Sequence, residues 1–272
     1  MSDAPGGTVA DRPLLGVTGV GKALTSADGD IVTVNENIDL ALAAGEFVSV
    51  VGPSGAGKTT LLRTLSGLTT PDTGVVSHHG EPMRGVPPWL AIVFQEYNKT
   101  LFPWLSVGRN VRLGARELPR GEAEERVARV LAGVGLEGQA RRYPWELSGG
   151  MQQRVALARA IIGNPELLLM DEPFASVDAL TRAKLEDVVL ELWERIGFAA
   201  LLVTHDIGEA IYLSDRVLVM SQRPSTIIAE LPVDLPRPRE QSTTRALPAF
   251  HALHDRVLGL VEDAGSAPAD RP

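Results

Sequence analysis

Residues 52–59 have the sequence Gly-Pro-Ser-Gly-Ala-Gly-Lys-Thr, in which Gly52 and Gly57 are separated by four residues and followed by Lys58 and Thr59. This is the pattern of a phosphate-binding loop, whose glycines allow backbone N–H groups to converge on phosphate oxygens. Lys58 would reach the outer phosphates of a nucleotide, and the hydroxyl of Thr59 would bind Mg²⁺. The pattern therefore predicts a nucleotide site with these contacts: Gly52, Pro53, Ser54, Gly55, Ala56, Gly57, Lys58, Thr59 and Thr60.

The surroundings of the loop argue against a chance match. From average residue usage, on the order of 1% of chains of this length would contain the pattern by chance. Residues 47–51 are a nearly continuous apolar run, as in a strand buried on both faces, and residues 59–65 have helical spacing. A helix after the loop would add the positive end of its dipole to the phosphate site. A strand, a glycine loop and a helix in this order indicate an α/β fold.

Two carboxylates follow the buried run 167–170, namely Asp171 and Glu172. Because open α/β sheets bind ligands at the carboxyl ends of their strands, we expect both side chains to lie near the loop. Asp171 would hold Mg²⁺ together with Thr59, and Gln95, which follows another predicted strand, would complete the metal shell. Glu172 would polarise the attacking water. Without the loop upstream, such residues would be interpreted as a solvated strand end.

His205 follows the apolar strand 198–203 and is expected at the same sheet edge. A single histidine in this position is usually structural, but its place beside Asp171 favours a contact with the γ-phosphate. The predicted catalytic residues are therefore Glu172, His205 and Lys58.

The segment 147–154, Leu-Ser-Gly-Gly-Met-Gln-Gln-Arg, permits two interpretations. A hydroxyl, an unobstructed glycine backbone and a helix N-terminus together make a second anion site. An ordinary helix cap at Ser148 explains the same residues equally well. The residue types alone do not decide between them.

Periodicity gives the elements that position these residues. We expect short strands with turns at 27–30 and 44–46 before the loop, and helices over 122–134, over 151–162 and after Asp178. The chain divides into a flexible leader (1–13), an α/β domain (14–240) with a helical insertion at about 98–152, and a tail (241–272). The tail shows only a weak helical patch at 253–261.

Composition excludes several classes of protein. The 272 residues include no cysteine, which excludes disulfides, thiolate zinc sites and a cysteine nucleophile. Acidic residues outnumber basic ones by 34 to 26, so the net charge of −8 argues against a nucleic-acid partner. The longest apolar stretch, 198–203, is far shorter than the ~20 residues of a spanning helix. With no signal-like N-terminus either, we expect cytoplasmic residence.

Taken together, these segments resemble the ATP-binding subunit of ABC transporters over roughly residues 15–240. In that family's terms, 52–59 is similar to Walker A, Gln95 to the Q-loop and 147–152 to the signature. Residues 167–172 look like Walker B, 176–178 like the D-loop and His205 like the switch histidine. The resemblance implies a P-loop NTPase fold: a RecA-like parallel sheet core, an antiparallel β subdomain and a helical insertion.

Finer features resemble the importers of nitrate, sulfonates and taurine, notably 93–97, 101–105 and 235–239. That resemblance implies an ATPase at the cytoplasmic face of the membrane, as a homodimer or a pair with a second ATP-binding subunit. Its other partners would be transmembrane permease subunits and, indirectly, an extracytoplasmic substrate-binding protein. The ATP of one subunit would be covered by four signature residues of the other: Ser148, Gly149, Gly150 and Gln152.

Three alternatives stay open at this stage. A soluble ABC ATPase acting on nucleic acid or ribosomes is the main one, although the acidic charge disfavours it. A P-loop kinase or small-molecule transferase is another, but it would not require the signature-like segment. The apolar trio 102–104 would contact the permease or, alternatively, pack internally.

One position departs from the family's pattern. Members usually place an aromatic ring against adenine about two dozen residues before Walker A, yet no Phe, Tyr or Trp occurs before Phe47. Leu24 takes that place. Because stacking of a base on an aromatic ring contributes ~1–3 kcal/mol, we expect looser ATP binding than in relatives that carry the ring.

Overall fold

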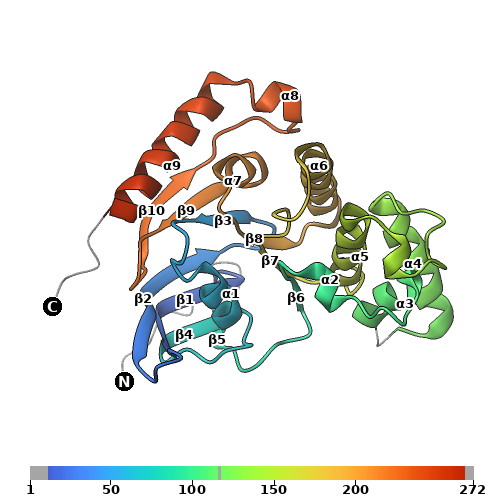
Figure 1. Ribbon diagram of the computed structural model, residues 1–272, viewed down its shortest axis with the longest axis horizontal. Coiled ribbons are helices and arrows are strands. Elements are labelled where there is room, and N and C mark those ends of the chain that lie inside the picture. Colours follow the sequence, from blue (N-terminus) through green and yellow to red (C-terminus); the bar gives the residue numbers. More distant parts are fainter. Residues whose placement is uncertain (1–11, 116–117, 267–272) are drawn as a thin grey trace, which may run out of the picture.

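A six-stranded sheet forms the centre of the computed structural model, which describes residues 12–115 and 118–266 (Figure 1). The strand order is β10-β9-β3-β8-β7-β6, and the five strands from β9 to β6 run parallel while β10 pairs antiparallel with β9. The bounds are β3 Phe47–Val51, β6 Leu90–Val93, β7 Leu167–Asp171, β8 Ala199–Val203, β9 Arg216–Met220 and β10 Ile227–Pro232. The predicted parallel core is present.

Both faces of this sheet are buried, which explains why its strands are continuous apolar runs. Side chains of β3 alternate: Phe47 and Val51 belong to one hydrophobic cluster, Val48 and Val50 to the other. The first cluster also includes residues of α5, α6 and α7, and the second includes α1 and the second sheet. The sheet is thus the middle layer of three, and the phosphate loop lies at the carboxyl end of its central strand β3.

The second sheet is antiparallel, in the order β2-β1-β4-β5. Helix α1 (Lys58–Leu65) contacts strands of both sheets, and its three leucines, Leu61, Leu62 and Leu65, are fully buried. Two long strands, β1 and β2, take the place of the short strands expected before the loop. The predicted turn joins them, and within it the Ser26 N–H donates to the Asp30 carbonyl. The bounds are β1 Leu15–Thr25, β2 Ile31–Leu42, β4 Thr73–His78 and β5 Glu81–Pro82.

The helical insertion lies between β6 and β7 and projects from one end of the sheet (Figure 1). Its two longer helices, α4 and α5, begin and end within two residues of the predicted positions. The bounds are α2 Tyr97–Thr100, α3 Val107–Arg112, η2 Leu113–Ala115, α4 Arg120–Gly133, η3 Pro144–Glu146 and α5 Gly149–Ile161.

Helix α6 (Ala179–Ile196) begins directly after Asp178, as predicted. The Asp178 carboxylate accepts from the N–H groups of Leu180 and Thr181, so it caps the helix. Gly197 ends the helix in the left-handed region, at φ 79°. Helix α7 (Ile207–Leu213) follows β8 and packs on the same side of the sheet.

The C-terminal region is more ordered than the sequence predicts. Instead of a weak patch at 253–261, the structure has α8 (Gln241–Thr244) and a long helix, α9 (Pro248–Ser266), which contacts α7 and β9. The buried residues of α9 are Phe250, Val257 and Ala264. They stand seven residues apart, and this sparse spacing is why periodicity indicated only part of the helix. The predicted leader lies largely outside the described residues, which start at 12.

Within the described residues, no helix has both the length and the apolar character needed to span a membrane.

A network of charged side chains joins α6, α7 and α8. The Arg245 guanidinium donates to the buried Glu186 carboxylate at 2.7 Å, and the Tyr212 hydroxyl donates to Asp187 at 2.7 Å. Glu209 on α7 is 4% exposed; it accepts from the Thr204 hydroxyl at 2.7 Å and lies 3.5 Å from the Arg182 Nε. Burial, the largest cause, raises the pKa of Glu209 to about 7.

We predict that Val257→Ala lowers the free energy of unfolding by about 2 kcal/mol, because it removes apolar atoms from a fully buried site. The neighbouring Leu258 is 37% exposed, and Leu258→Ala should change stability by less than about 0.5 kcal/mol. Chemical denaturation of both variants measures this difference. Equal effects would show that α9 does not pack on the core in solution.

We also predict a pH-dependent effect of Glu209→Gln. Between about pH 4.5 and 7 the folded state keeps a proton on Glu209 that the unfolded state has lost, so the contribution of Glu209 to stability falls as the pH rises. Glutamine has no such proton. The free energy of unfolding of the variant, relative to the parent, should therefore increase by on the order of 2 kcal/mol from about pH 5 to about pH 8.

Denaturation at several pH values measures this trend, with Glu191→Gln, at an exposed position of α6, as the control. A difference between Glu209→Gln and the parent that stays constant with pH would contradict the prediction.

Candidate nucleotide-binding and hydrolysis site

The predicted phosphate loop connects β3 to α1 and is shaped by left-handed glycines. Gly55 and Gly57 have φ values of 79° and 89°, which side chains rarely adopt. A Cβ atom at Gly57 would also lie 2.3 Å from the Cγ1 of Val34, so only glycine fits there. The loop ends at the first residue of α1, where free backbone N–H groups and the helix dipole favour an anion.

Lys58 supplies a buried positive charge to this loop. Its side chain is 7% exposed, and its Nζ donates to the carbonyls of Gly52 at 2.7 Å and Pro53 at 3.0 Å. Burial lowers the pKa of Lys58, while the charges of Glu172 and Asp171 oppose the shift. The ammonium therefore donates hydrogen bonds to two carbonyls of the loop.

Thr59 and Asp171 meet as predicted. The Thr59 hydroxyl donates to the Asp171 carboxylate at 3.1 Å, although 112 residues separate them along the chain. Burial raises the pKa of Asp171, and the Thr59 hydrogen bond acts against this shift. A hydroxyl and a carboxylate oxygen together are the kind of donors that Mg²⁺ prefers.

Glu172 occupies the centre of the site in a strained backbone conformation. Its φ is 43°, unusual for a residue with a side chain, and its N–H donates to the Val203 carbonyl at 2.8 Å. The carboxylate accepts from Gln95 Nε2 at 3.0 Å and lies 3.3 Å from His205 Nδ1. The structure thus brings Gln95 to Glu172, and the place of Gln95 in the metal shell stays a prediction.

A cavity of about 410 Å³ opens over the loop. Arg223, between β9 and β10, contributes to its wall and has no predicted role. The motif spacing could not reveal Arg223, because its place depends on how a distant loop returns to the site. The remaining lining residues are Ser54, Gly55, Ala56, Gly57, Lys58, Thr59, Thr60, Glu172 and His205.

The signature-like segment does not line this cavity. Ser148 caps α5, accepting from the Met151 N–H, and Gln152 donates to the carbonyls of Pro144 and Leu147. A Cβ atom at Gly150 would lie 2.5 Å from Thr181 Cγ2, so this glycine also allows α5 to approach α6 closely. Both interpretations of the segment therefore remain compatible with a single copy of the chain.

The comparisons with known proteins agree with this geometry. The family model described as "ABC transporter" matches residues 35–175. The aliphatic sulfonates import ATP-binding protein SsuB 2 of Burkholderia lata is 47% identical over 83% of this chain and 84% of the relative. The nitrate import ATP-binding protein NrtC of Synechocystis is 39% identical over 90% of this chain and 37% of the relative.

The fold is also similar to solved structures. The dimeric post-hydrolysis state of the ATP-binding cassette MJ0796 bound to ADP and Pi has a TM-score of 0.71 and 30% identity, covering 80% of this chain and 98% of that one. The structure of cbiO1 from Clostridium perfringens, part of the ABC transporter complex cbiONQ, has a TM-score of 0.72 and 26% identity, covering 82% and 90%.

These findings confirm the P-loop NTPase fold and the family resemblance that the motifs indicate. The cavity is lined by the phosphate loop, its lysine and the side chain of Glu172, and a relative that is 47% identical is an import ATP-binding protein. The chain is therefore an ATP-binding and ATP-hydrolysing protein that belongs to the ABC transporter family.

Proposed function

We propose that this ATPase powers the import of small anions of the sulfonate or nitrate class through a membrane permease. The observation that carries the proposal is the 47% identity to a sulfonate import subunit over most of both chains. A soluble ATPase acting on nucleic acid or ribosomes fits less well, because the net charge is −8 and these relatives are import subunits.

Thr59 and Asp171 are the residues proposed to hold Mg²⁺, and their contact at 3.1 Å supports this role. Gln95 donates its Nε2 to Glu172 in this structure, and its Oε1 is the atom that would join the metal shell. The bound ion would neutralise charge on the phosphate oxygens.

Glu172 is proposed to orient the water that attacks the γ-phosphate. It is held by Gln95 and lies within 3.3 Å of His205, so the same residues that would touch the nucleotide also determine where this carboxylate points. Lys58 would exchange its loop carbonyls for phosphate oxygens, and His205 would contact the γ-phosphate. Preorganised charges of this kind stabilise the transition state of phosphoryl transfer more than they stabilise the bound substrate.

A second ATP-binding subunit, most simply another copy of this chain, is proposed to complete the site. The residues that would come from the partner are Ser148, Gly149, Gly150 and Gln152. Ser148 and Gly149 are exposed at the start of α5, outside the cavity of their own chain. A helix N-terminus that is exposed in one copy is suited to contact the phosphates bound by another.

The permease is proposed to bind the helical insertion near its aromatic residues, which would hold the ATPase at the cytoplasmic face of the membrane. Phe102 is 38% and Trp104 68% exposed, with ring centroids 5.3 Å apart. Their exposure favours an interface over internal packing, since aromatic residues are enriched where interfaces are most buried. An extracytoplasmic binding protein would deliver the solute to the permease.

The test of the enzymatic role is Glu172→Gln. The variant should bind ATP and form a stable dimer, but its kcat should fall at least ~100-fold because the water loses its base. Phosphate release measures kcat, and size-exclusion chromatography with ATP measures formation of the ATP-bound dimer. Glu262→Gln, at an exposed position of α9, is the control. Hydrolysis at the parent rate would remove Glu172 from this role.

The transport proposal is tested by co-purification and uptake. The chain should co-purify with a multi-span membrane protein, and cells without the chain should lose uptake of an alkanesulfonate or of nitrate. ATPase activity that is stimulated by nucleic acid and not by a permease would contradict import.

Leu24 occupies the position where relatives usually carry an aromatic residue, and this gives a further prediction. Leu24 is 43% exposed and pairs with Val32 on β2, two residues from Val34, which contacts the phosphate loop at Gly57. Leu24→Tyr should tighten ATP binding several-fold by stacking on adenine. Titration with a fluorescent ATP analogue measures the dissociation constant, and Val86→Tyr, at another exposed apolar position, controls for a nonspecific aromatic effect. An unchanged dissociation constant would contradict the prediction.

A further inference from the structure

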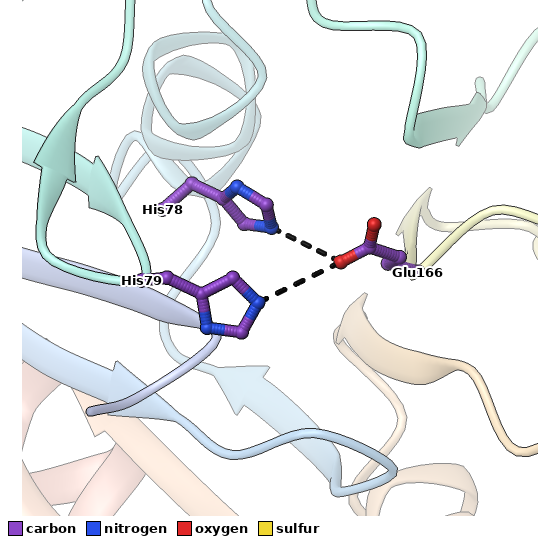
Figure 2. A group of neighbouring side chains, drawn as sticks. All are labelled: His78, His79 and Glu166. Carbon is purple, nitrogen blue, oxygen red and sulfur yellow. Dashed lines mark hydrogen bonds and ion pairs between the residues drawn. The ribbon is translucent and has the colours of Figure 1, made fainter. Parts of the chain in front are cut away.

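His78, His79 and Glu166 come together at the surface where the antiparallel sheet meets the start of β7 (Figure 2). We propose that these three side chains bind a divalent transition-metal ion such as Zn²⁺. Glu166 precedes β7 and Asp171 ends it, so the strand separates this cluster from the nucleotide site by roughly 16 Å. The proposed site is therefore independent of the proposed transport function.

The hairpin between β4 and β5 brings the two histidines to one place. His78 pairs with Glu81 across the hairpin, so His79 and Gly80 are its two turn residues. Both have positive φ values, 48° and 84°, as a two-residue turn of type I′ requires. Histidine is among the side chains enriched in this conformation.

The two imidazoles present the same nitrogen to a single carboxylate oxygen. His78 Nε2 lies 3.1 Å and His79 Nε2 3.8 Å from Glu166 Oε2, as Figure 2 shows. The His78 ring stacks on Trp89, with centroids 3.7 Å apart and an angle of 15° between the planes, which fixes its orientation. The Nδ1 of His79 is buried, so Nε2 is the nitrogen that this ring offers to a ligand.

These distances fit a tetrahedral ion. With bonds of about 2.0–2.1 Å, two ligands of a tetrahedral Zn²⁺ lie about 3.3 Å apart, and the distances of 3.1 and 3.8 Å from Glu166 Oε2 to the two imidazoles bracket that separation. All three ligand atoms lie within 4.8 Å of one another. Their side chains are 21%, 40% and 50% exposed, so an ion can enter from solvent and a water can take the fourth position.

The donor set determines the kind of ion. Two imidazole nitrogens and one carboxylate suit Zn²⁺ and similar transition metals, whereas Mg²⁺ and Ca²⁺ require mostly oxygen ligands. A bound ion would link the β4–β5 hairpin to the segment before β7 and thereby join the two sheets. The Arg12 side chain lies against Gly80, and its charge opposes the ion, so we expect weaker binding than in a structural zinc site.

The test is a titration of the tag-free, chelator-stripped full chain with Zn²⁺ by calorimetry, in the absence of nucleotide. We expect one equivalent to bind at the cluster, and Co²⁺ at the same site to give the visible absorption of tetrahedral coordination. Zn²⁺ should also raise the melting temperature, because an ion that binds only the folded state stabilises it.

Two variants identify the ligands. His79→Ala and Glu166→Gln should each weaken this binding at least ~10-fold, since even partners of metal ligands contribute 10–100-fold to affinity. Both positions are partly exposed, and melting curves in chelator establish that the variants fold. The matched control is His251→Ala, at an exposed position of α9, which should leave the titration unchanged.

In a titration without nucleotide, His205 and Glu172 are a second pair of side chains able to bind Zn²⁺, so His205→Ala provides a second comparison. Loss of the equivalent in His205→Ala and its retention in His79→Ala would overturn the proposal. So would a parent chain that binds no Zn²⁺, or equal affinities in the parent, His79→Ala and Glu166→Gln.

Discussion

The parallel pairing of β3, β8 and β7 is the constraint on which the site depends. Val203 at the end of β8 pairs with Val50 on one side and with Asp171 on the other, so the three strands end at one level. The segments that leave these strands therefore reach the same edge, and they carry the phosphate loop, Glu172 and His205. A shift of this register by one residue would turn the buried side chains to the opposite face and move the functional groups along the edge.

The two hydrophobic layers stabilise that register. The side chains of β3 pack into two different hydrophobic clusters, one on each face of the sheet. Because neither face is exposed to solvent, a register shift would disrupt the packing on both faces. Helix α1 provides one of these layers and also starts at the phosphate loop, so its packing between the sheets sets the direction of its N-terminus. The precision of the site thus derives from apolar packing away from it.

The sequence was most informative where function depends on local order. The loop at 52–59, the cap at Asp178 and the strand before Asp171 each contain their own signal within a few residues, and the structure places all of them as expected. The contact of Gln95 with Glu172, the place of Arg223 and the packing of α9 arise instead from residues far apart in the chain. The His78, His79 and Glu166 cluster belongs to this second group, because Glu166 is 87 residues beyond His79 and only the fold brings them together.

The backbone conformation of Glu172 and the contacts of its carboxylate are fixed by different parts of the chain. Its positive φ costs on the order of 1–3 kcal/mol and is maintained by the bond from its N–H to Val203. Gln95 and His205 then satisfy the carboxylate from two different loops, each outside the strand that carries Glu172. Gln95 leads directly into the helical insertion. A movement of the insertion would therefore displace Gln95 and change its hydrogen bond to the Glu172 carboxylate. Under the proposed function, binding of a permease to the insertion would therefore change the orientation of the Glu172 carboxylate without any change in the phosphate loop.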